Sequence, residues 1–84
     1  EDSFRVQVEF KGWAARFVSE RTWSPDQKLV KRKDGTIRLT FTTSSEQEFI
    51  SWVLSFREEA KVLRPKWLVE TMKQTLEATL SSYS

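Results

Sequence analysis

The stretch from residue 45 to residue 65 constrains the fold most, because it carries start signals for two helices around one short strand. Ser45 and Glu48 form a capping box, in which each side chain accepts a hydrogen bond from the other residue's amide. This motif predicts a helix that starts at Glu46. A wide apolar stripe follows at helical spacing: Phe49, Ile50, Val53, Leu54 and Phe56.

The second half of this stretch predicts a strand between two helices. Val62 and Leu63 suit a short buried strand, because such side chains are favoured there. Glu58 and Glu59 precede them and are poor strand residues, so they indicate a reversal of the chain. Pro65 is tolerated in a helix only in its first turn, and it therefore predicts the start of another helix.

The N-terminal third predicts a strand, a helix and a second strand. Apolar side chains occupy every second position from Phe4 to Phe10, which is the period of a strand with one buried face. Residues 11–21 then carry apolar side chains on one face of a helix. The Trp-Ser-Pro-Asp segment at 23–26 ends that helix, and residues 27–32 are predicted to form the second strand.

The turn at residues 33–35 predicts a hairpin, for which two registers are open. A two-residue loop places Val30 opposite Leu39, whereas a type I turn followed by a left-handed Gly35 places Leu29 there. A slip of one residue exchanges the two faces of the strand. We favour the second register, because Leu29 then joins the apolar side chains of the next strand.

A last helix is predicted from Pro65 onward, because apolar residues recur every four positions: Leu68, Met72, Leu76 and Leu80, flanked by Val69. The stripe drifts around the helix axis, so we expect its final turn to leave the core and to dock against another domain or subunit. Residues 81–84 are predicted to be a frayed tail.

Together these elements predict an α+β fold of the ferredoxin-like split βαβ type (βαββαβ). Right-handed crossovers and short connections give an antiparallel four-stranded sheet with two helices on one face and an additional C-terminal helix. The 84 residues suffice for one small domain, residues 1–84. The expected core consists of Phe10, Phe17, Leu39, Phe49, Val53 and Val62.

The residue types that the chain lacks argue against catalysis. The sequence contains no Cys, His or Asn, which removes the usual zinc ligands, thiol nucleophiles and histidine acids or bases. The carboxylates are scattered and mostly lie beside Lys or Arg. We therefore expect no catalytic residues, no metal site and no cofactor, and we do not expect an enzyme.

Composition also bears on where the protein acts. No apolar run approaches the ~20 residues of a membrane span, and there is no signal-peptide pattern, so no membrane contact is expected. The absence of Cys fits a cytoplasmic protein. The chain starts at Glu1 without an initiator Met, and we expect it to be the C-terminal fragment of a longer protein.

Positive charge is concentrated in the N-terminal half, around the hairpin. In the favoured register, one face of the sheet carries four cations with two more contacts at its edge: Arg5, Lys28, Arg32 and Arg38, then Trp23 and Gln27. Such cations can contact the phosphates of a nucleic-acid or nucleotide effector. Two other interpretations remain open: the charged face contacts only solvent, and Trp23 covers the edge of the core.

Four ordered segments resemble the WCX domain, the C-terminal extension that follows WYL domains in bacterial transcriptional regulators. They read ERTWSPDQ, DGTIRLTF, WVLSF and VLRP, at residues 20–27, 34–41, 52–56 and 62–65. The resemblance spans about residues 4–80. The family commonly has Gly after the Trp-x-x-x-Phe segment, where this chain has Arg57, and it often has His where this chain has Ser24.

The resemblance implies a parent protein of three parts. These are an N-terminal winged helix-turn-helix that binds DNA, a central WYL domain that senses a ligand, and this domain at the C-terminus. It further implies dimer contacts and, in some members, help in binding a nucleic-acid effector. We therefore expect a regulatory and oligomerisation module that forms a homodimer in the full-length protein and associates weakly or not at all as a fragment.

Two other functions remain open on the sequence alone. A stand-alone single-stranded nucleic-acid binder is less favoured, because RNA-recognition domains of this architecture stack bases on aromatic rings of the open sheet face. No ring is predicted there. A small-ligand or acylphosphatase-like domain would use Gly12 and Arg16 as an anion loop, but that chemistry needs an Asn, which the chain lacks.

Overall fold

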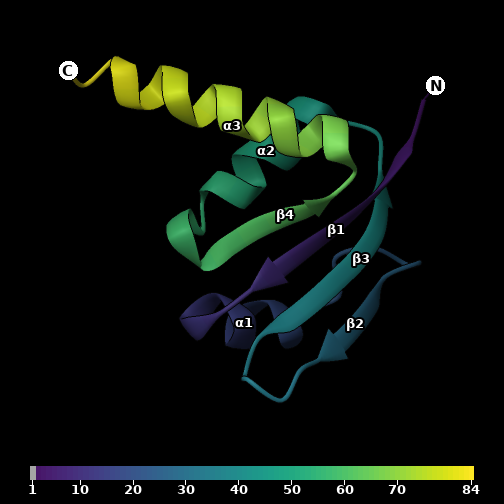
Figure 1. Ribbon diagram of the computed structural model, residues 1–84. Coiled ribbons are helices and arrows are strands. Elements are labelled where there is room, and N and C mark those ends of the chain that lie inside the picture. Colours follow the sequence, from purple (N-terminus) through teal and green to yellow (C-terminus); the bar gives the residue numbers. More distant parts are fainter. Residues whose placement is uncertain (1) are drawn as a thin grey trace.

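The computed structural model of the protein describes residues 2–84 and contains one sheet flanked by helices (Figure 1). The elements are β1 (Phe4–Phe10), α1 (Gly12–Ser19), β2 (Lys28–Lys31), β3 (Ile37–Thr43), α2 (Glu46–Leu54), the 3-10 turn η1 (Arg57–Glu59), β4 (Ala60–Arg64) and α3 (Lys66–Ser81). The strand order is β2-β3-β1-β4, and every neighbouring pair is antiparallel. The predicted α+β fold is confirmed, and it is compatible with a ferredoxin-like split βαβ.

One face of the sheet is covered by α1 and α2, and the core lies between them (Figure 1). Inward-facing residues of the central strands β1 and β3 meet Ala14 and Val18 of α1 and Phe49 and Val53 of α2. Burial of these apolar side chains supplies most of the free energy that favours folding. Five of the six predicted core residues are buried as expected: Phe10, Leu39, Phe49, Val53 and Val62.

The prediction that Phe17 is a core residue is confirmed only in part, because Phe17 packs against the core, 5.9 Å from the ring of the buried Phe56, without being fully buried itself. Its side chain is only half-buried, and it stacks on Trp13 at a ring-centroid distance of 4.7 Å. The guanidinium carbon of Arg21 lies 3.9 Å from the centre of the same ring. The buried side chains of α1 are the smaller Ala14, Ala15 and Val18, and Phe17 lies beside them at the rim of the helical layer.

The hairpin adopts the favoured register, with Leu29 opposite Leu39. Gly35 has φ 91°, the positive value that this turn requires of its bulge residue. The Asp34 carboxylate accepts hydrogen bonds from the amide and the hydroxyl of Thr36, at 3.0 and 2.7 Å. β2 is shorter than the strand predicted at 27–32, because Gln27 belongs to the preceding loop and residue 32 belongs to the turn.

Helix α2 starts at Glu46, as the capping box predicted. The Ser45 hydroxyl accepts a hydrogen bond from the Glu48 amide at 3.3 Å. Within residues 2–84 the reciprocal bond to the Glu48 side chain is not formed, which leaves that carboxylate free of the box. After α2 the chain reverses through Arg57, which has φ 57°.

Helix α3 runs along the β4 side of the sheet, with its C-terminal part extending past the rest of the domain (Figure 1). Leu68 and Met72 are buried, whereas Leu76 is 50% exposed and Leu80 is 73% exposed. The expectation that the last turns leave the core is confirmed. Ser81 ends the helix and hydrogen-bonded turns follow, so fraying of 81–84 stays a prediction.

No helix among residues 2–84 combines the length and the apolar character that crossing a membrane requires.

Candidate functional site

The sheet face away from α1 and α2, called the open sheet face here, carries the predicted cations. Val6, Val8 and Phe10 of β1 point into the core, so Arg5 and Glu9 point out. Residues directly opposite each other in an antiparallel pair share a face. Arg38 lies opposite Glu9, and Lys28 lies opposite Thr40. The register therefore brings Arg5, Lys28 and Arg38 onto the open sheet face.

Strand β4 adds two cations to this face that the sequence analysis missed. Lys61 lies opposite Glu9, and Arg64 lies opposite Gln7. Both are exposed. Their placement depends on a bulge between the pairs of Gln7 and Val8, which shifts the register of β4 by one residue. The spacing of Lys61 and Arg64 suits opposite faces of a regular strand, so only the bulge aligns them.

Two cations of the open sheet face are paired with carboxylates. The Arg38 Nε atom lies 3.3 Å from the Glu9 Oε2 atom, across the β1–β3 pair. The Arg5 Nη1 atom lies 2.9 Å from the Asp26 Oδ2 atom and also donates to the Thr42 hydroxyl at 3.3 Å. Both pairs are partly exposed, so each contributes about 0–1 kcal/mol to stability. They orient the two guanidinium groups more than they stabilise the fold.

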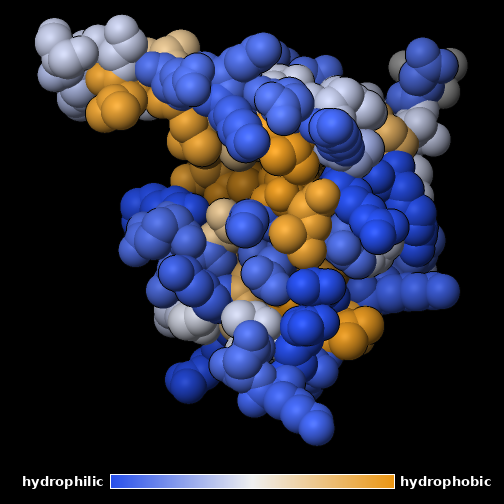
Figure 2. Space-filling view, in the orientation of Figure 1, coloured by the Kyte–Doolittle hydropathy of each residue, from blue (hydrophilic) through white to orange (hydrophobic). Residues whose placement is uncertain are grey.

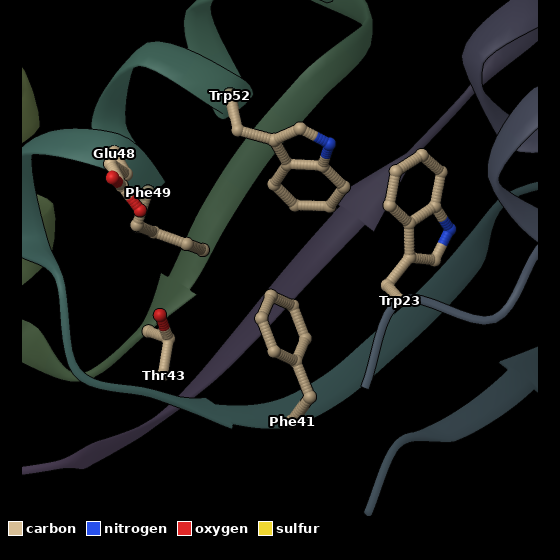
Figure 3. Close-up of a pocket in the computed structure, with 6 residues that line it drawn as sticks. All are labelled: Trp23, Phe41, Thr43, Glu48, Phe49 and Trp52. Carbon is tan, nitrogen blue, oxygen red and sulfur yellow. The ribbon is translucent and has the colours of Figure 1, made fainter. Parts of the chain in front are cut away.

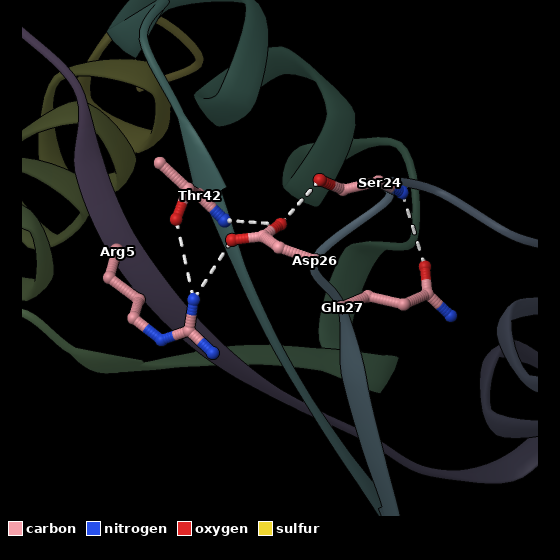
Figure 4. A network of polar contacts seen from close by, with 5 residues as sticks. All are labelled: Arg5, Ser24, Asp26, Gln27 and Thr42. Atoms are coloured by element: carbon pink, nitrogen blue, oxygen red, sulfur yellow. Dashed lines mark hydrogen bonds and ion pairs between the residues drawn. The ribbon is translucent and has the colours of Figure 1, made fainter.

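Asp26 is the centre of a polar network that joins the loop before β2 to the sheet edge (Figure 4). The Ser24 hydroxyl donates to its Oδ1 atom at 2.6 Å, and the Thr42 amide donates to the same atom at 3.3 Å. These hydrogen bonds, that from Ser24 foremost, hold the pKa of the Asp26 carboxyl well below its usual range, and Arg5 adds to the effect. Asp26 thus stays negative and holds Arg5 in place.

Trp23 and Gln27 belong to the same loop and make hydrogen bonds on its other side. The Gln27 Oε1 atom accepts hydrogen bonds from the amides of Trp23 and Ser24, at 2.6 and 3.2 Å. The Trp23 indole Nε1 donates to the Val18 carbonyl at 3.0 Å, and its ring packs 5.1 Å from that of Trp52. Trp23 is half-buried on the helical side of the sheet, so it does not join the cations of the open sheet face.

Arg32 lies apart from the other predicted cations, at the end of the hairpin. Its amide donates to the Thr36 carbonyl at 2.9 Å, and its carbonyl accepts from the Gly35 amide at 3.2 Å. The pKa of Asp34 is lowered, chiefly by the Thr36 hydroxyl and amide and further by the charge of Arg32. Arg32 therefore belongs to the turn, where a carboxylate offsets part of its charge.

The N-terminus of α1 is occupied by the protein's own carboxylate. The Glu59 Oε1 atom accepts a hydrogen bond from the Ala14 amide at 3.0 Å, and the Glu59 carbonyl accepts one from the Lys11 amide at 2.9 Å. Gly12 has φ 59°, and a Cβ atom there would collide with the Glu59 carboxylate. An external anion would have to displace Glu59, so this geometry argues against the anion loop of an acylphosphatase-like site.

The open sheet face also lacks the rings that single-strand binders of this architecture use. Its outward positions on β1 and β3 hold charged and polar side chains: Arg5, Gln7, Glu9, Arg38, Thr40 and Thr42. Val30 of β2, which is 56% exposed, is the large apolar side chain opposite Arg38. Cations can hold phosphates there, but bases find no aromatic platform.

An apolar groove, called the α3 groove here, lies between α3 and the segment from α2 to β4. It has a volume of about 540 Å³ and the following apolar lining: Val53, Leu54, Ala60, Met72 and Leu76. Arg57 and Glu58 lie at its rim. Figure 2 shows the apolar surface directly below α3. Exposed apolar patches of this kind commonly mark contacts with other domains or subunits.

Within residues 2–84, no three His, Cys, Asp or Glu side chains come together in a way that could hold a metal ion.

In a comparison with protein families, residues 2–80 match the family described as the WCX domain. Comparison with curated proteins gives no match.

Proposed function

This chain belongs to the WCX domain family, and from this premise we propose that it is the C-terminal regulatory module of a WYL-type winged helix-turn-helix transcriptional regulator. Its open sheet face makes an auxiliary contact with an anionic effector, a nucleic acid or a nucleotide, that the WYL domain holds mainly. The observation that carries this proposal is the set of cations from all four strands on that face: Arg5, Lys28, Arg38, Lys61 and Arg64.

The charge balance of this face supports an anionic ligand. Glu9 is the carboxylate that points out from β1, and it is already paired with Arg38. Lys28, Lys61 and Arg64 form no ion pair within the part of the chain that the structure describes. Electrostatic contacts alone typically give dissociation constants of ~10⁻⁴–10⁻⁶ M, which weaken steeply as salt rises. The isolated domain should therefore bind single strands weakly and without sequence preference.

Charge reversal on the open sheet face tests this proposal. Lys28→Glu combined with Arg64→Glu should impair the effector response of the full-length regulator, because both substitutions convert attraction for phosphates into repulsion. In the proposed parent protein the winged helix is a separate N-terminal domain, so operator binding should be unchanged. A reporter assay with and without effector, together with operator binding by the purified proteins, measures both outcomes.

The matched control reverses two lysines outside the open sheet face, Lys33 in the hairpin turn and Lys66 at the start of α3. Both are exposed, and Lys33→Glu with Lys66→Glu changes the net charge by the same amount. The control should respond normally to effector. A normal response of the Lys28/Arg64 variant would mean that the open sheet face is only a solvated surface.

We further propose that the α3 groove and the exposed end of α3 contact the WYL domain or the second subunit of a homodimer. Leu76 and Leu80 of α3 are 50% and 73% exposed, and Tyr83, which follows the helix, is 86% exposed. Sedimentation should show the 84-residue chain as a monomer and the full-length protein as a dimer that Leu76→Glu with Leu80→Glu weakens. A tight dimer of the 84-residue chain would contradict this prediction.

A further inference from the structure

Four aromatic rings surround a small pocket on the helical side of the sheet (Figure 3). Trp23 comes from the loop before β2, Phe41 from β3, and Phe49 and Trp52 from α2. The pocket has a volume of about 200 Å³. This is below the roughly 300–1,000 Å³ of pockets that hold whole small-molecule ligands, so the aromatic pocket fits a group the size of one side chain.

The rings are held in place before any ligand arrives. The ring centroids of Trp23 and Trp52 are 5.1 Å apart, and those of Phe41 and Trp52 are 5.8 Å apart. The Trp23 indole N–H already donates to the Val18 carbonyl at 3.0 Å. Its N–H group is therefore satisfied, and Trp23 brings no free hydrogen-bond donor to the pocket. Preorganisation of this kind reduces the entropy lost on binding.

The polar groups of the aromatic pocket favour positive charge. Its only lining residues with polar side chains besides the two indoles are Glu48 and Thr43. Within residues 2–84, the Glu48 carboxylate has no ion-pair partner and accepts no hydrogen bond. The faces of aromatic rings are also electron-rich and attract cations. Among residues 2–84, neither Lys nor Arg lines the pocket, so the negative charge of a phosphate would be repelled by the carboxylate and the ring faces.

We propose that the aromatic pocket binds an organic cation, a quaternary ammonium or guanidinium group, which packs against Trp23 and Trp52 beside the Glu48 carboxylate. This goes beyond the proposed function, which concerns an anion on the opposite face of the sheet. Aromatic surfaces that enclose an ammonium group are a recurrent solution for this ligand class, and a nearby carboxylate adds a direct electrostatic attraction.

A titration followed by ¹⁵N-resolved NMR on the 84-residue chain tests the proposal. The probes are choline and its neutral isostere 3,3-dimethylbutan-1-ol, which has the same shape without the charge. Choline should shift the indole N–H signals of Trp23 and Trp52 and the amide signal of Glu48. The isostere should bind at least about threefold more weakly, the ratio expected for a cation–π contact at a partly exposed site. N-acetylargininamide in a parallel titration shows whether a protein side chain or a free ammonium compound is the better ligand.

Two variants isolate the carboxylate. Glu48→Gln should weaken choline binding without changing that of the isostere. Glu46→Gln removes a carboxylate from the same first turn of α2, but Glu46 does not line the pocket, so binding of both probes should be unchanged. Equal affinity for choline and the isostere, an equal effect of the two variants, or tighter binding of adenosine than of choline at these signals would overturn the proposal.

Discussion

Replacement of Phe49 by Ala is expected to lower the free energy of unfolding by about 3–5 kcal/mol. The Phe49 side chain is 3% exposed, and its ring lies 6.0 Å from that of Phe41 and 6.2 Å from that of Trp52. Truncation leaves a cavity. The rigid sheet on one side prevents this cavity from collapsing. Small domains have about 5–15 kcal/mol of stability in total, so a large fraction of it would be lost.

Urea denaturation followed by circular dichroism measures this change, and Phe17→Ala is the matched control. Phe17 is only half-buried at the rim of the helical layer, so its truncation should lower the stability clearly less than that of Phe49. A Phe49→Ala protein that unfolds at the same urea concentration as the unsubstituted chain would contradict the description of the core.

Replacement of Gly12 by Ala is expected to lower the free energy of unfolding by about 1.5–4 kcal/mol. A residue with a Cβ atom loses roughly 1–2 kcal/mol at a left-handed position such as φ 59°. The same Cβ atom collides with the Glu59 carboxylate and disrupts its bond to the Ala14 amide. Loss of such a helix cap adds about 0.5–2 kcal/mol.

Gly35→Ala is the control that separates the two contributions. Gly35 also has a positive φ, but a Cβ atom there meets nothing within 4 Å. Its replacement should therefore cost only the backbone part in the same denaturation experiment. If Gly12→Ala destabilises the chain no more than Gly35→Ala, the close approach of Glu59 to Gly12 does not contribute to the loss of stability.

The parts of the fold that sequence reasoning predicted are those that depend on local patterns. The register of the β2–β3 hairpin followed from the alternation of apolar residues, because only one register puts Leu29 inside opposite Leu39. The start of α2 followed from the Ser45 cap. The same alternation was enough to predict that Arg5, Lys28 and Arg38 share one face of the sheet.

The parts that sequence reasoning missed depend on contacts between distant segments. Glu59 caps a helix that begins 47 residues earlier in the chain, at Gly12, and no local sequence pattern predicts this contact. Asp26 forms an ion pair with Arg5, which lies 21 residues earlier in the chain. Lys61 and Arg64 reach the open sheet face only because β4 bulges, and the position of a bulge depends on how β1 pairs with it.

The left-handed conformation of Arg57 affects more than the turn in which it lies. A glycine would adopt φ 57° without the roughly 1–2 kcal/mol that a side chain costs there, so the isolated domain is less stable than its backbone allows. The arginine side chain lies at the rim of the α3 groove, next to Glu58. Replacement of Arg57 by glycine would therefore relieve the backbone cost and at the same time remove a positive charge from the groove.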